Sequence, residues 1–497
     1  MNWTDFFPAT AAEWLKTIYF FIILSFLIGI SEFLSRSFGL SKEFTRKFVH
    51  VSVGVLVFIF SFFITGAQAL IFLCLVFSII NLLIIKFDLV PALNGNRKSY
   101  GTVYYPLALM IALIMLWDHY KIIFLNIVLI LALADAAAAI VGQNSKKPIT
   151  YKILNDVKTI QGSSAMFFTT FIIIVGLYFT NEKIELSYSI WIIAPIIALI
   201  ITLAEAISSK GSDNLSISII SGFFLFIFFF GSEQTQMQTI YSLFFAAIIA
   251  ITSTKLGFLK TDGALAVSML SIIIYGLGGW KWTFPILTFF ILSSILSYTG
   301  KNLKQSFNLM FEKTSRRDAK QVLANGGAAV FWIFIYFIFP IEYIYWAYIV
   351  SIAAATADTW ATELGVFNKS NPIMITTFKP VEKGESGAIS LIGTLSALAG
   401  SIVIILSSLL FSDSIGFQTF ILLVLFGFSG SLFDSLIGAK FQAQYINNLS
   451  NKTTEKPLDS KGRENQLLRG YIWINNDAVN FISIFMASLL PLIFLMF

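Results

Sequence analysis

The residues that most often build disulfides and zinc sites are nearly absent from this sequence of 497 residues. It contains one cysteine, Cys74, and two histidines, His50 and His119. A single cysteine excludes an intrachain disulfide, and so few cysteines and histidines argue against a structural zinc site. Charged residues are also scarce at 12%, about half the content of an ordinary soluble domain, which excludes that class of protein.

Familiar nucleotide-binding signatures are missing as well. Neither half of the sequence contains a Walker A sequence or the protein-kinase signatures. If this protein uses a nucleoside triphosphate, its phosphate-binding site differs from those of the Walker A and protein-kinase families.

Long apolar segments dominate what is present. Hydrophobic residues make up 57% of the chain and the mean hydropathy is +0.82. Apolar runs of roughly 17–25 residues recur from end to end, the length of a helix that crosses a hydrocarbon core of about 30 Å. The spans must be helical, because unpaired backbone groups cost several kcal/mol each in lipid and the runs lack the alternation of barrel strands. We predict an all-α, polytopic transmembrane protein with about 16 helices (14–16) in two related halves.

Basic residues gather in alternate loops. Lysine and arginine follow the odd-numbered helices, whereas the loops between them, such as residues 181–185 and 231–233, are short and poor in basic residues. The positive-inside rule then places the basic loops in the cytoplasm and both termini outside. We read the net charge of +6 as facing anionic lipid rather than nucleic acid. The expected location is a bacterial cytoplasmic (inner) membrane, with the active sites on the cytoplasmic side.

The boundary between the halves is expected at the polar link of residues 231–236. This gives an N-terminal domain of residues 1–235 and a C-terminal domain of residues 236–497, each with about eight helices. The first apolar run, near residues 17–33, is longer than a signal-peptide core and is expected to remain as a helix. Residues 439–475 form the longest soluble loop, long enough to fold over a site.

One charged pattern occurs in both halves. Asp135 and Asp358 each follow an alanine at the end of an apolar run, and each precedes a glycine, Gly142 or Gly365, at the same spacing. A polar loop with a lysine and a small-residue turn comes next, at residues 158–163 and 383–388. Intramembrane carboxylates are expensive to desolvate, so they suggest function. The alternative is that each aspartate pairs with a loop lysine to fix helix packing.

Carboxylates beside glycines, facing a loop with lysine and hydroxyl groups, suit a magnesium nucleotide, because hard oxygen ligands hold the metal and lysine meets phosphate. Further candidates in the first half are basic groups that could clamp phosphate and an acidic pair across a short turn: Arg46, His50, Arg97, Glu205, Asp213 and Asn214. Membrane anchoring, interfacial hydrogen bonding and helix capping remain alternatives for them. The second half offers Arg316, Arg317, Lys379, Asp434, Asn476, Asp477 and Asn480, for which a structural network between helices is the alternative.

Together these motifs resemble two membrane families. Residues 36–225 are similar to the dolichol kinase and phytol kinase family, through Arg46-Lys47-x-x-His50, Tyr100-Gly101-Thr102, the Asp135 segment, Lys158-x-x-x-Gly162, Glu205 and Lys210-Gly211-Ser212-Asp213-Asn214. Residues from about 240 onward resemble the family that includes the plant phytyl-phosphate kinase, through Arg316-Arg317-Asp318, the Asp358 segment with Glu363 and Gly365, Lys379-Pro380-Val381, Ser386-Gly387, Asp434-Ser435 and Asn476-Asp477-x-Val479-Asn480.

The resemblance implies two sequential kinases that use CTP and magnesium. The first half would phosphorylate an isoprenoid alcohol such as phytol, farnesol or geranylgeraniol, and the second would convert the prenyl monophosphate to the diphosphate. It implies catalytic roles for Asp135, Lys158, His50, Asp358 and Lys383. It implies nucleotide or phosphate contacts from Arg46, Arg97, Gly142, Gly162, Asn214, Arg316, Arg317, Gly365, Lys379, Gly387, Asn476 and Asn480. It implies metal ligation by Asp135, Glu205, Asp213, Asp358, Glu363, Asp434 and Asp477.

Two other functions remain open at this point. The aspartate, glycine and lysine layout is also similar to phosphatidate cytidylyltransferases, which use CTP to make a CDP-lipid. The internal duplication and the polar residues in spans would also fit a lipid-phosphate transporter.

Overall fold

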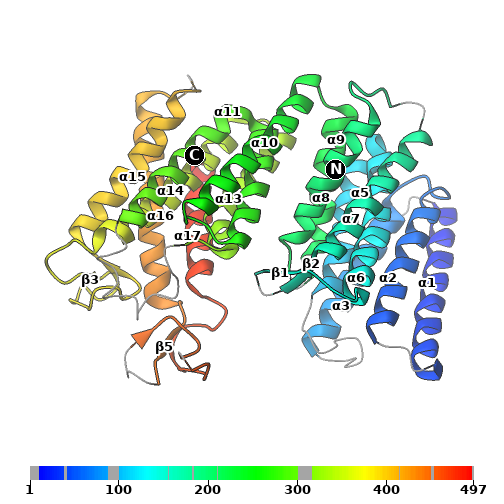
Figure 1. Ribbon diagram of the computed structural model, residues 1–497, viewed down its shortest axis with the longest axis horizontal. Helices are drawn as coiled ribbons and strands as arrows, with labels where there is room; N and C mark the ends of the chain where they lie inside the picture. Colours follow the sequence, from blue (N-terminus) through cyan, green and yellow to red (C-terminus); the bar gives the residue numbers. More distant parts are fainter. Residues whose placement is uncertain are drawn as a thin grey trace. The chain divides into compact units, whose positions relative to one another are not determined.

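The computed structural model describes residues 10–38, 42–87, 100–154, 156–181, 184–209, 211–299, 316–412, 415–448, 453–459 and 461–494. The chain divides into two compact units, residues 1–236 (unit 1) and 237–497 (unit 2) (Figure 1). Within the residues just given, eleven helices are long and apolar enough to cross a membrane. The prediction of an all-α, polytopic membrane protein is therefore confirmed.

Unit 1 consists of helices and one short antiparallel hairpin. Its helical elements are α1 (Ala11–Phe38), α2 (Lys42–Phe60), α3 (Gln68–Phe87), α5 (Gly101–Leu129), η2 (Ile130–Ala134), α6 (Asp135–Asn144), α7 (Ile160–Phe179), α8 (Ile190–Ala206) and α9 (Asp213–Phe230). The hairpin pairs β1 (Thr150–Ile153) with β2 (Asp156–Thr159), with Thr150 opposite Thr159. Helix α5 bends at Tyr120, whose backbone is not helical, and η2 is a single π-helical turn immediately before Asp135. Such π turns within helices often mark functional sites.

Unit 2 has longer connections between its helices. The helices are α10 (Glu233–Lys255), which begins just before the boundary, α11 (Thr261–Thr299), α13 (Ala319–Ile338), α14 (Glu342–Gly365), α15 (Leu391–Leu409), α16 (Phe417–Lys440) and α17 (Asn476–Phe494). Strands β3 (Ile373–Met374) and β4 (Ala388–Ile389) pair with each other, and β5 (Gln444–Ile446) lies between β6 (Thr453–Thr454) and β7 (Gln466–Arg469). Helix α11 bends at Gly279, where φ is +63°, a conformation that favours glycine.

Each unit is built around one central helix that ends in the repeated aspartate segment. In unit 2 this is α14, which packs against α13, α15, α16 and α17, with Tyr345 and Tyr348 fully buried. In unit 1 it is the second part of α5, continuing through η2 into α6, with Phe124 and Leu131 fully buried. Close packing on all sides makes these helices rigid supports for Asp135 and Asp358.

The two units repeat one order of elements. In each, three helical segments and a connection precede a fourth helix, then the central helix, a β-hairpin, a helix that starts at a hydroxyl N-cap, another helix, a polar connection and a final helix. If the kinked α5 and α11 are counted as two segments each, and η2 and α6 as the continuation of the second segment of α5, the described part of the chain has sixteen helical segments, the number expected from the sequence. The order of elements supports reading the sequence repeat as two related halves.

Candidate functional site

A polar cavity of about 420 Å³ lies in unit 2, at the end of the central helix where Asp358 is found. Its walls come from the start of α13, the last turns of α14, the β3–β4 connection, the start of α15, and α16 and α17. Among its lining residues are Arg317, Asp358, Glu363, Gly365, Lys383, Gly387, Asp434, Asn476 and Asn480. Most of the candidate residues of the second half are therefore brought together in one place.

Two carboxylates face the interior of this cavity from different helices. Asp358 of α14 and Asp434 of α16 lie close enough to interact electrostatically. The Ser483 hydroxyl donates to Asp434 Oδ2 at 3.3 Å. The amide of Asn480 lies 3.1 Å from the same oxygen, and its nitrogen must face the carboxylate because a carboxylate can only accept. Two hydrogen bonds to Oδ2 thus hold the Asp434 carboxylate in place.

This donor set suits magnesium. Mg²⁺ is usually held by one or two protein carboxylates together with substrate phosphates and water, so it does not need a cage of acidic side chains. Asp358 and Asp434 would supply the carboxylates, with Asn480 supporting Asp434. Among the described residues, no group of three or more histidine, cysteine, aspartate or glutamate side chains is placed to bind a metal. A metal here would therefore depend on phosphate oxygens as well.

Cationic groups lie at the wall of the same cavity. Lys383 is fixed by donating to the Asn368 carbonyl at 2.6 Å. Arg317, in the connection before α13, is held by its backbone, which pairs with the strand-like stretch at Leu259. Burial lowers the pKa of the Arg317 guanidinium and the nearby Glu363 raises it, but an arginine whose ordinary pKa exceeds about 12 stays charged at neutral pH. The lining of the cavity thus combines cationic side chains with two aspartates.

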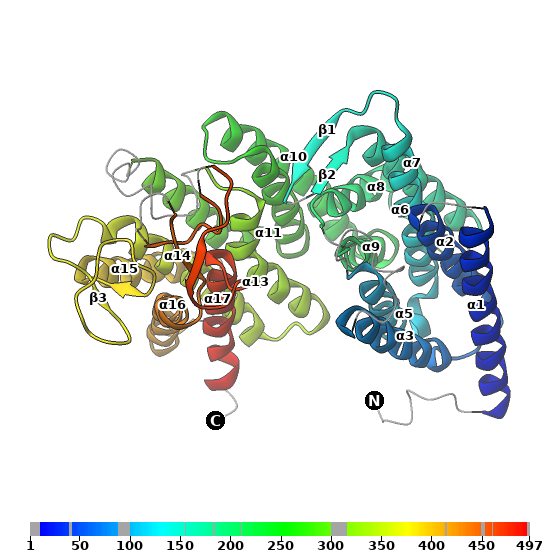
Figure 2. The same cartoon turned by 90° about the horizontal axis from the view of Figure 1, so that it is seen from below.

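The long polar loop after α16 covers this end of unit 2, as its length suggested. Gln442 accepts from the Ser386 hydroxyl at 2.5 Å and donates to Glu455 at 2.8 Å, and Arg469 lies 3.6 Å from Glu385. These contacts tie the loop to the turn that carries Gly387, and Glu455 itself lines the cavity. Figure 2 shows β5 and its loop in front of the ends of α14, α16 and α17.

Unit 1 carries its candidate residues as two ion pairs. The Lys47 ammonium lies 2.6 Å from Asp135, and the Lys158 ammonium lies 2.5 Å from Glu205 and also binds the Glu205 carbonyl. All four side chains are only 10–15% exposed. Asp213, at the start of α9, interacts electrostatically with Asp135, Lys158 and Lys47. The two pairs and Asp213 form one cluster of alternating charge.

Two residues near this cluster are anchored by backbone groups. His50 Nε2 lies 2.8 Å from the Leu131 carbonyl and 3.7 Å from Asp135 Oδ2. A carbonyl can only accept, so Nε2 carries a proton and is the donor. Asn214 donates to the Gly101 carbonyl at 3.0 Å, which joins α9 to the start of α5. In this arrangement His50 Nε2 binds the Leu131 carbonyl of η2, and a catalytic role for His50 remains a prediction.

The carboxylates of unit 1 are less suited to magnesium than those of unit 2. Each of Asp135 and Glu205 already has an ammonium group against it, and an ammonium competes with a divalent cation for the same oxygens. A metal role for Asp135, Glu205 and Asp213 remains a prediction. The lysines would have to turn toward phosphate oxygens before these carboxylates could ligate a cation.

The sequence prediction missed Lys47, which lies beside the arginine that it selected. Lys47 and His50 are three residues apart, which puts them on the same face of α2, whereas the Arg46 side chain is exposed. Helical spacing was thus the signal that distinguishes Lys47 from Arg46 as the partner of Asp135.

The paired glycines have a packing role in both units. A methyl group on Gly162 would come within 2.8 Å of the Ala138 carbonyl and 3.4 Å of Gly142 Cα, and one on Gly393 would lie 3.2 Å from the Ala361 carbonyl and 3.6 Å from Gly365 Cα. Thr159 and Ser390 cap the helices that begin just before Gly162 and Gly393. The central helix and the helix after the hairpin therefore meet at a glycine pair.

This geometry changes which parts of the two repeats correspond. The sequence pattern paired the Lys158 segment with the Lys383 segment, but the structural counterpart of Thr159 and Gly162 is Ser390 and Gly393. Lys383 instead lies in the longer β3–β4 connection. Lys158 and Lys383 are therefore not equivalent positions, although both lie beside a candidate site.

A few predicted residues lie elsewhere. Arg97 lies outside the described residues. Lys379 is exposed in the turn before the Lys383 segment, and Arg316 is exposed beside Gly257. Asp477 lies on the first turn of α17, next to the cavity residue Asn476. Gly387 has φ +86° and packs so closely on Ala439 that a methyl group there would lie 2.5 Å from the alanine Cβ. That contact alone requires glycine.

The sequence is similar to those of several known membrane proteins. An uncharacterized membrane protein of Methanocaldococcus jannaschii is 35% identical over 220 residues, which are 43% of this chain and 88% of that protein. Protein PGR of Arabidopsis thaliana is 29% identical over 279 residues, 51% of this chain and 95% of that protein. A protein named phytol kinase from Synechocystis sp. is 26% identical over 219 residues, 43% of this chain and 91% of that protein.

No solved structure matches the sequence. Residues 244–488, which contain the polar cavity and all of α11 to α16, match the family described as integral membrane protein DUF92. With a relative that is 35% identical over 88% of its length, the chain belongs to this family of integral membrane proteins.

Proposed function

We propose that this protein is a membrane kinase for isoprenoid lipids, in which unit 1 phosphorylates a prenol and unit 2 phosphorylates the prenyl monophosphate. The observation that carries the proposal is the polar cavity of unit 2, whose lining contains two aspartates, Asp358 and Asp434, together with Arg317 and Lys383. The name of the Synechocystis relative, phytol kinase, supports a prenol as one of the two acceptors, the one that we assign to unit 1. The proposed nucleotide is CTP with magnesium, bound from the cytoplasmic side of a bacterial inner membrane.

Phosphoryl transfer needs positioning and charge compensation rather than covalent chemistry by the protein. In unit 2 an oxygen of the lipid phosphate would attack the γ-phosphorus, and the bond to the bridging oxygen would break to release the nucleoside diphosphate. Arg317 and Lys383 would orient phosphate oxygens, and Asp358 and Asp434 would hold magnesium, which neutralises phosphate charge when bound. In unit 1 Lys47 and Lys158 would contact phosphates, with Asp135, Glu205 and Asp213 around them.

Product analysis tests this proposal. The full-length protein in lipid nanodiscs is incubated with magnesium, each of the four ribonucleoside triphosphates, and farnesol, geranylgeraniol, phytol or their monophosphates. Mass spectrometry follows both lipid and nucleotide. We expect prenyl mono- and diphosphate with release of CDP. A lipid carrying CMP, with pyrophosphate released, would contradict the kinase and indicate a cytidylyltransferase, and no turnover of any nucleotide with any lipid would leave a transporter.

A further inference from the structure

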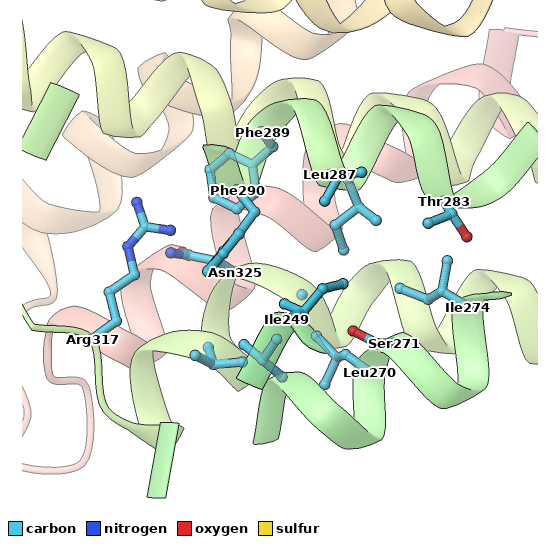
Figure 3. A pocket seen from close by; sticks show the side chains of 14 residues that line it. Ile249, Leu270, Ser271, Ile274, Thr283, Leu287, Phe289, Phe290, Arg317 and Asn325 are labelled. Atoms are coloured by element: carbon cyan, nitrogen blue, oxygen red, sulfur yellow. The ribbon is translucent and has the colours of Figure 1, made fainter. Parts of the chain in front are cut away.

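A second, apolar pocket lies beside the polar cavity in unit 2. It has a volume of about 70 Å³ and is lined by residues of α10, α11 and α13. Nine of its fourteen lining residues are aliphatic or aromatic, among them Ile249, Leu270, Ile274, Leu287 and Phe290. Figure 3 shows Arg317 and Asn325 at one end of this group and Ile274 and Thr283 at the other. The charged side chain of Arg317 therefore lies at one end of the pocket, and the rest of the lining is uncharged and mostly apolar.

Two residues belong to both hollows. Arg317 and Asn325 line the apolar pocket and also the polar cavity that contains Asp358 and Asp434. The Arg317 guanidinium lies 5.3 Å from the centre of the Phe289 ring, which is part of the apolar wall. Arginine combines this kind of aromatic contact with bidentate binding of phosphate. Arg317 thus lies at the junction between a pocket that suits a hydrocarbon chain and a cavity that suits a phosphate group.

We propose that the apolar pocket binds the first part of the hydrocarbon chain of a single-chain lipid monophosphate, with its phosphate on Arg317 and directed into the polar cavity. The inference rests on the proposed function in that the polar cavity is taken as the reaction site. A volume of about 70 Å³ corresponds to on the order of five water-sized spheres, which suits a short branched segment of one chain. The pocket would therefore select single-chain prenyl phosphates over two-chain lipids such as phosphatidate.

Binding without nucleotide tests the inference separately from turnover. The full-length protein in detergent is titrated with geranylgeranyl monophosphate, isopentenyl monophosphate, geranylgeraniol and phosphatidate. Ser271→Leu adds bulk to the apolar pocket, since Ser271 lines it. Ser268→Leu is the matched control, one turn earlier on α11, where the hydroxyl binds its own helix and the side chain is not part of the lining. Arg317→Gln removes the charge at the junction.

In the unmodified protein we expect geranylgeranyl monophosphate to bind more tightly than phosphatidate. Ser271→Leu should weaken geranylgeranyl monophosphate by about 10-fold or more and leave isopentenyl monophosphate within about 2-fold, because the bulk excludes several methylene groups. Arg317→Gln should weaken both monophosphates by roughly 10- to 100-fold and leave geranylgeraniol unchanged, since a hydrogen bond to a charged group is lost. Ser268→Leu should match the unmodified protein.

The inference is overturned if Ser271→Leu binds geranylgeranyl monophosphate as well as Ser268→Leu does, or if it weakens the short and long phosphates equally. Tighter binding of phosphatidate would also overturn it. Measuring turnover separates a failure of the lipid-site inference from a failure of the proposed kinase function. The expected binding pattern without nucleotide consumption would support the lipid site and contradict the kinase function. Diphosphate formation by Ser271→Leu at the KM of the unmodified protein would support the kinase function and contradict the lipid site.

Discussion

At the scale of single residues, the charge cluster of unit 1 depends on ion pairs that are almost out of contact with water. The Lys158 and Glu205 side chains are 15% and 10% exposed. Desolvating two charges costs several kcal/mol each, so such a pair contributes little net stability but leaves a large penalty when one partner is removed. Its presence at this point therefore indicates a use for the charges beyond holding α8 to the hairpin.

This argument predicts the outcome of a double-mutant cycle. Lys158→Met or Glu205→Gln alone should lower the free energy of unfolding by about 3–5 kcal/mol, because each leaves a buried charge without its partner. Lys158→Met combined with Glu205→Met should recover most of that loss but none of the prenol kinase activity. Thermal unfolding in detergent and initial rates measure the two effects. Full activity in the double variant would contradict a role for the pair in the reaction.

The Asp459 carboxylate makes the stability of a turn in the loop that covers one end of unit 2 depend on pH. Asp459 accepts from the Arg463 and Lys461 amides at 2.9 and 2.8 Å and from Arg463 Nε at 2.8 Å. These hydrogen bonds, that of the Arg463 backbone first, lower the pKa of Asp459 below its ordinary value. A carboxylate whose pKa is lower in the folded state stabilises that state at pH values above its unfolded-state pKa of about 3.9. This stabilisation is lost as the pH falls through the folded-state pKa.

We therefore expect this turn to loosen as the pH falls below about 4 and through the lowered pKa of Asp459, at which the folded carboxylate gains a proton. Asp459→Asn should show the same loosening at neutral pH, because an amide cannot accept at both positions while holding the arginine. Limited proteolysis with an acid-stable protease, read by intact mass, would detect cleavage within residues 453–469. Equal resistance of the variant and the unmodified protein at pH 7 would show that other contacts hold the turn.

At the scale of elements, the contact between the central helix and the helix after the hairpin needs glycine at one point. On α7, Gly162 faces the Ala138 carbonyl, whereas a methyl group on Gly176 would have no atom within 4 Å. Gly162→Ala should force α6 and α7 apart and lower the free energy of unfolding by about 1–3 kcal/mol. Gly176→Ala should raise it by up to about 1 kcal/mol through helix propensity.

Thermal unfolding of the two alanine variants, prepared side by side, checks this prediction. Gly393→Ala should be destabilising by a smaller amount than Gly162→Ala, because its methyl group would lie 3.2 Å from the Ala361 carbonyl rather than 2.8 Å from the Ala138 carbonyl. A Gly162→Ala variant as stable as Gly176→Ala would mean that the two helices separate without cost.

Features that depend on a short continuous segment of sequence were predicted better than features that depend on the lengths of the loops. Apolar length identified the helices, and the Asp135 and Asp358 segments were found because each lies within one continuous helix. The correspondence of the loops was not predicted, because the connection from Asp358 to Ser390 is longer than that from Asp135 to Thr159 and a count from the aspartate assumes equal loops. Both units instead keep a hydroxyl residue three positions before a glycine at the start of an apolar run, Thr159 with Gly162 and Ser390 with Gly393. This pattern identifies the corresponding helices although the connections differ in length.

The candidate site was predictable only as a set of residues and not as contacts. Asp358 and Lys383 were singled out from the repeated pattern and Glu363 from the family resemblance, and all three line one cavity. Their neighbours on α16 and α17 come from far along the chain. The ion pair of Lys158 with Glu205 joins a hairpin to the end of α8, which no local pattern reveals. The apolar pocket at Arg317 likewise needs three helices to exist.

At the scale of the whole molecule, two units with one order of elements have different charged groups around the aspartate at the same position. Asp135 is held by Lys47 and lies near Lys158, whereas Asp358 faces a second aspartate, Asp434. An uncharged alcohol needs a site that can take up its proton and supply phosphate contacts, whereas a lipid monophosphate brings two negative charges that need metal and arginine. The difference between the clusters therefore fits two successive acceptors rather than two copies of one reaction.

This division predicts reciprocal losses. Asp135→Asn keeps the size of the side chain but removes its charge, so prenol phosphorylation should fall by roughly 100-fold or more while phosphorylation of the monophosphate continues. Asp358→Asn should do the reverse. Each reaction is measured separately on the full-length protein, with geranylgeraniol or geranylgeranyl monophosphate supplied. Asp118→Asn, which changes an exposed carboxylate of α5, serves as the matched control and should leave both rates unchanged. Loss of both reactions in either variant would mean that the units share one site, since independent units cannot silence each other through an isosteric change.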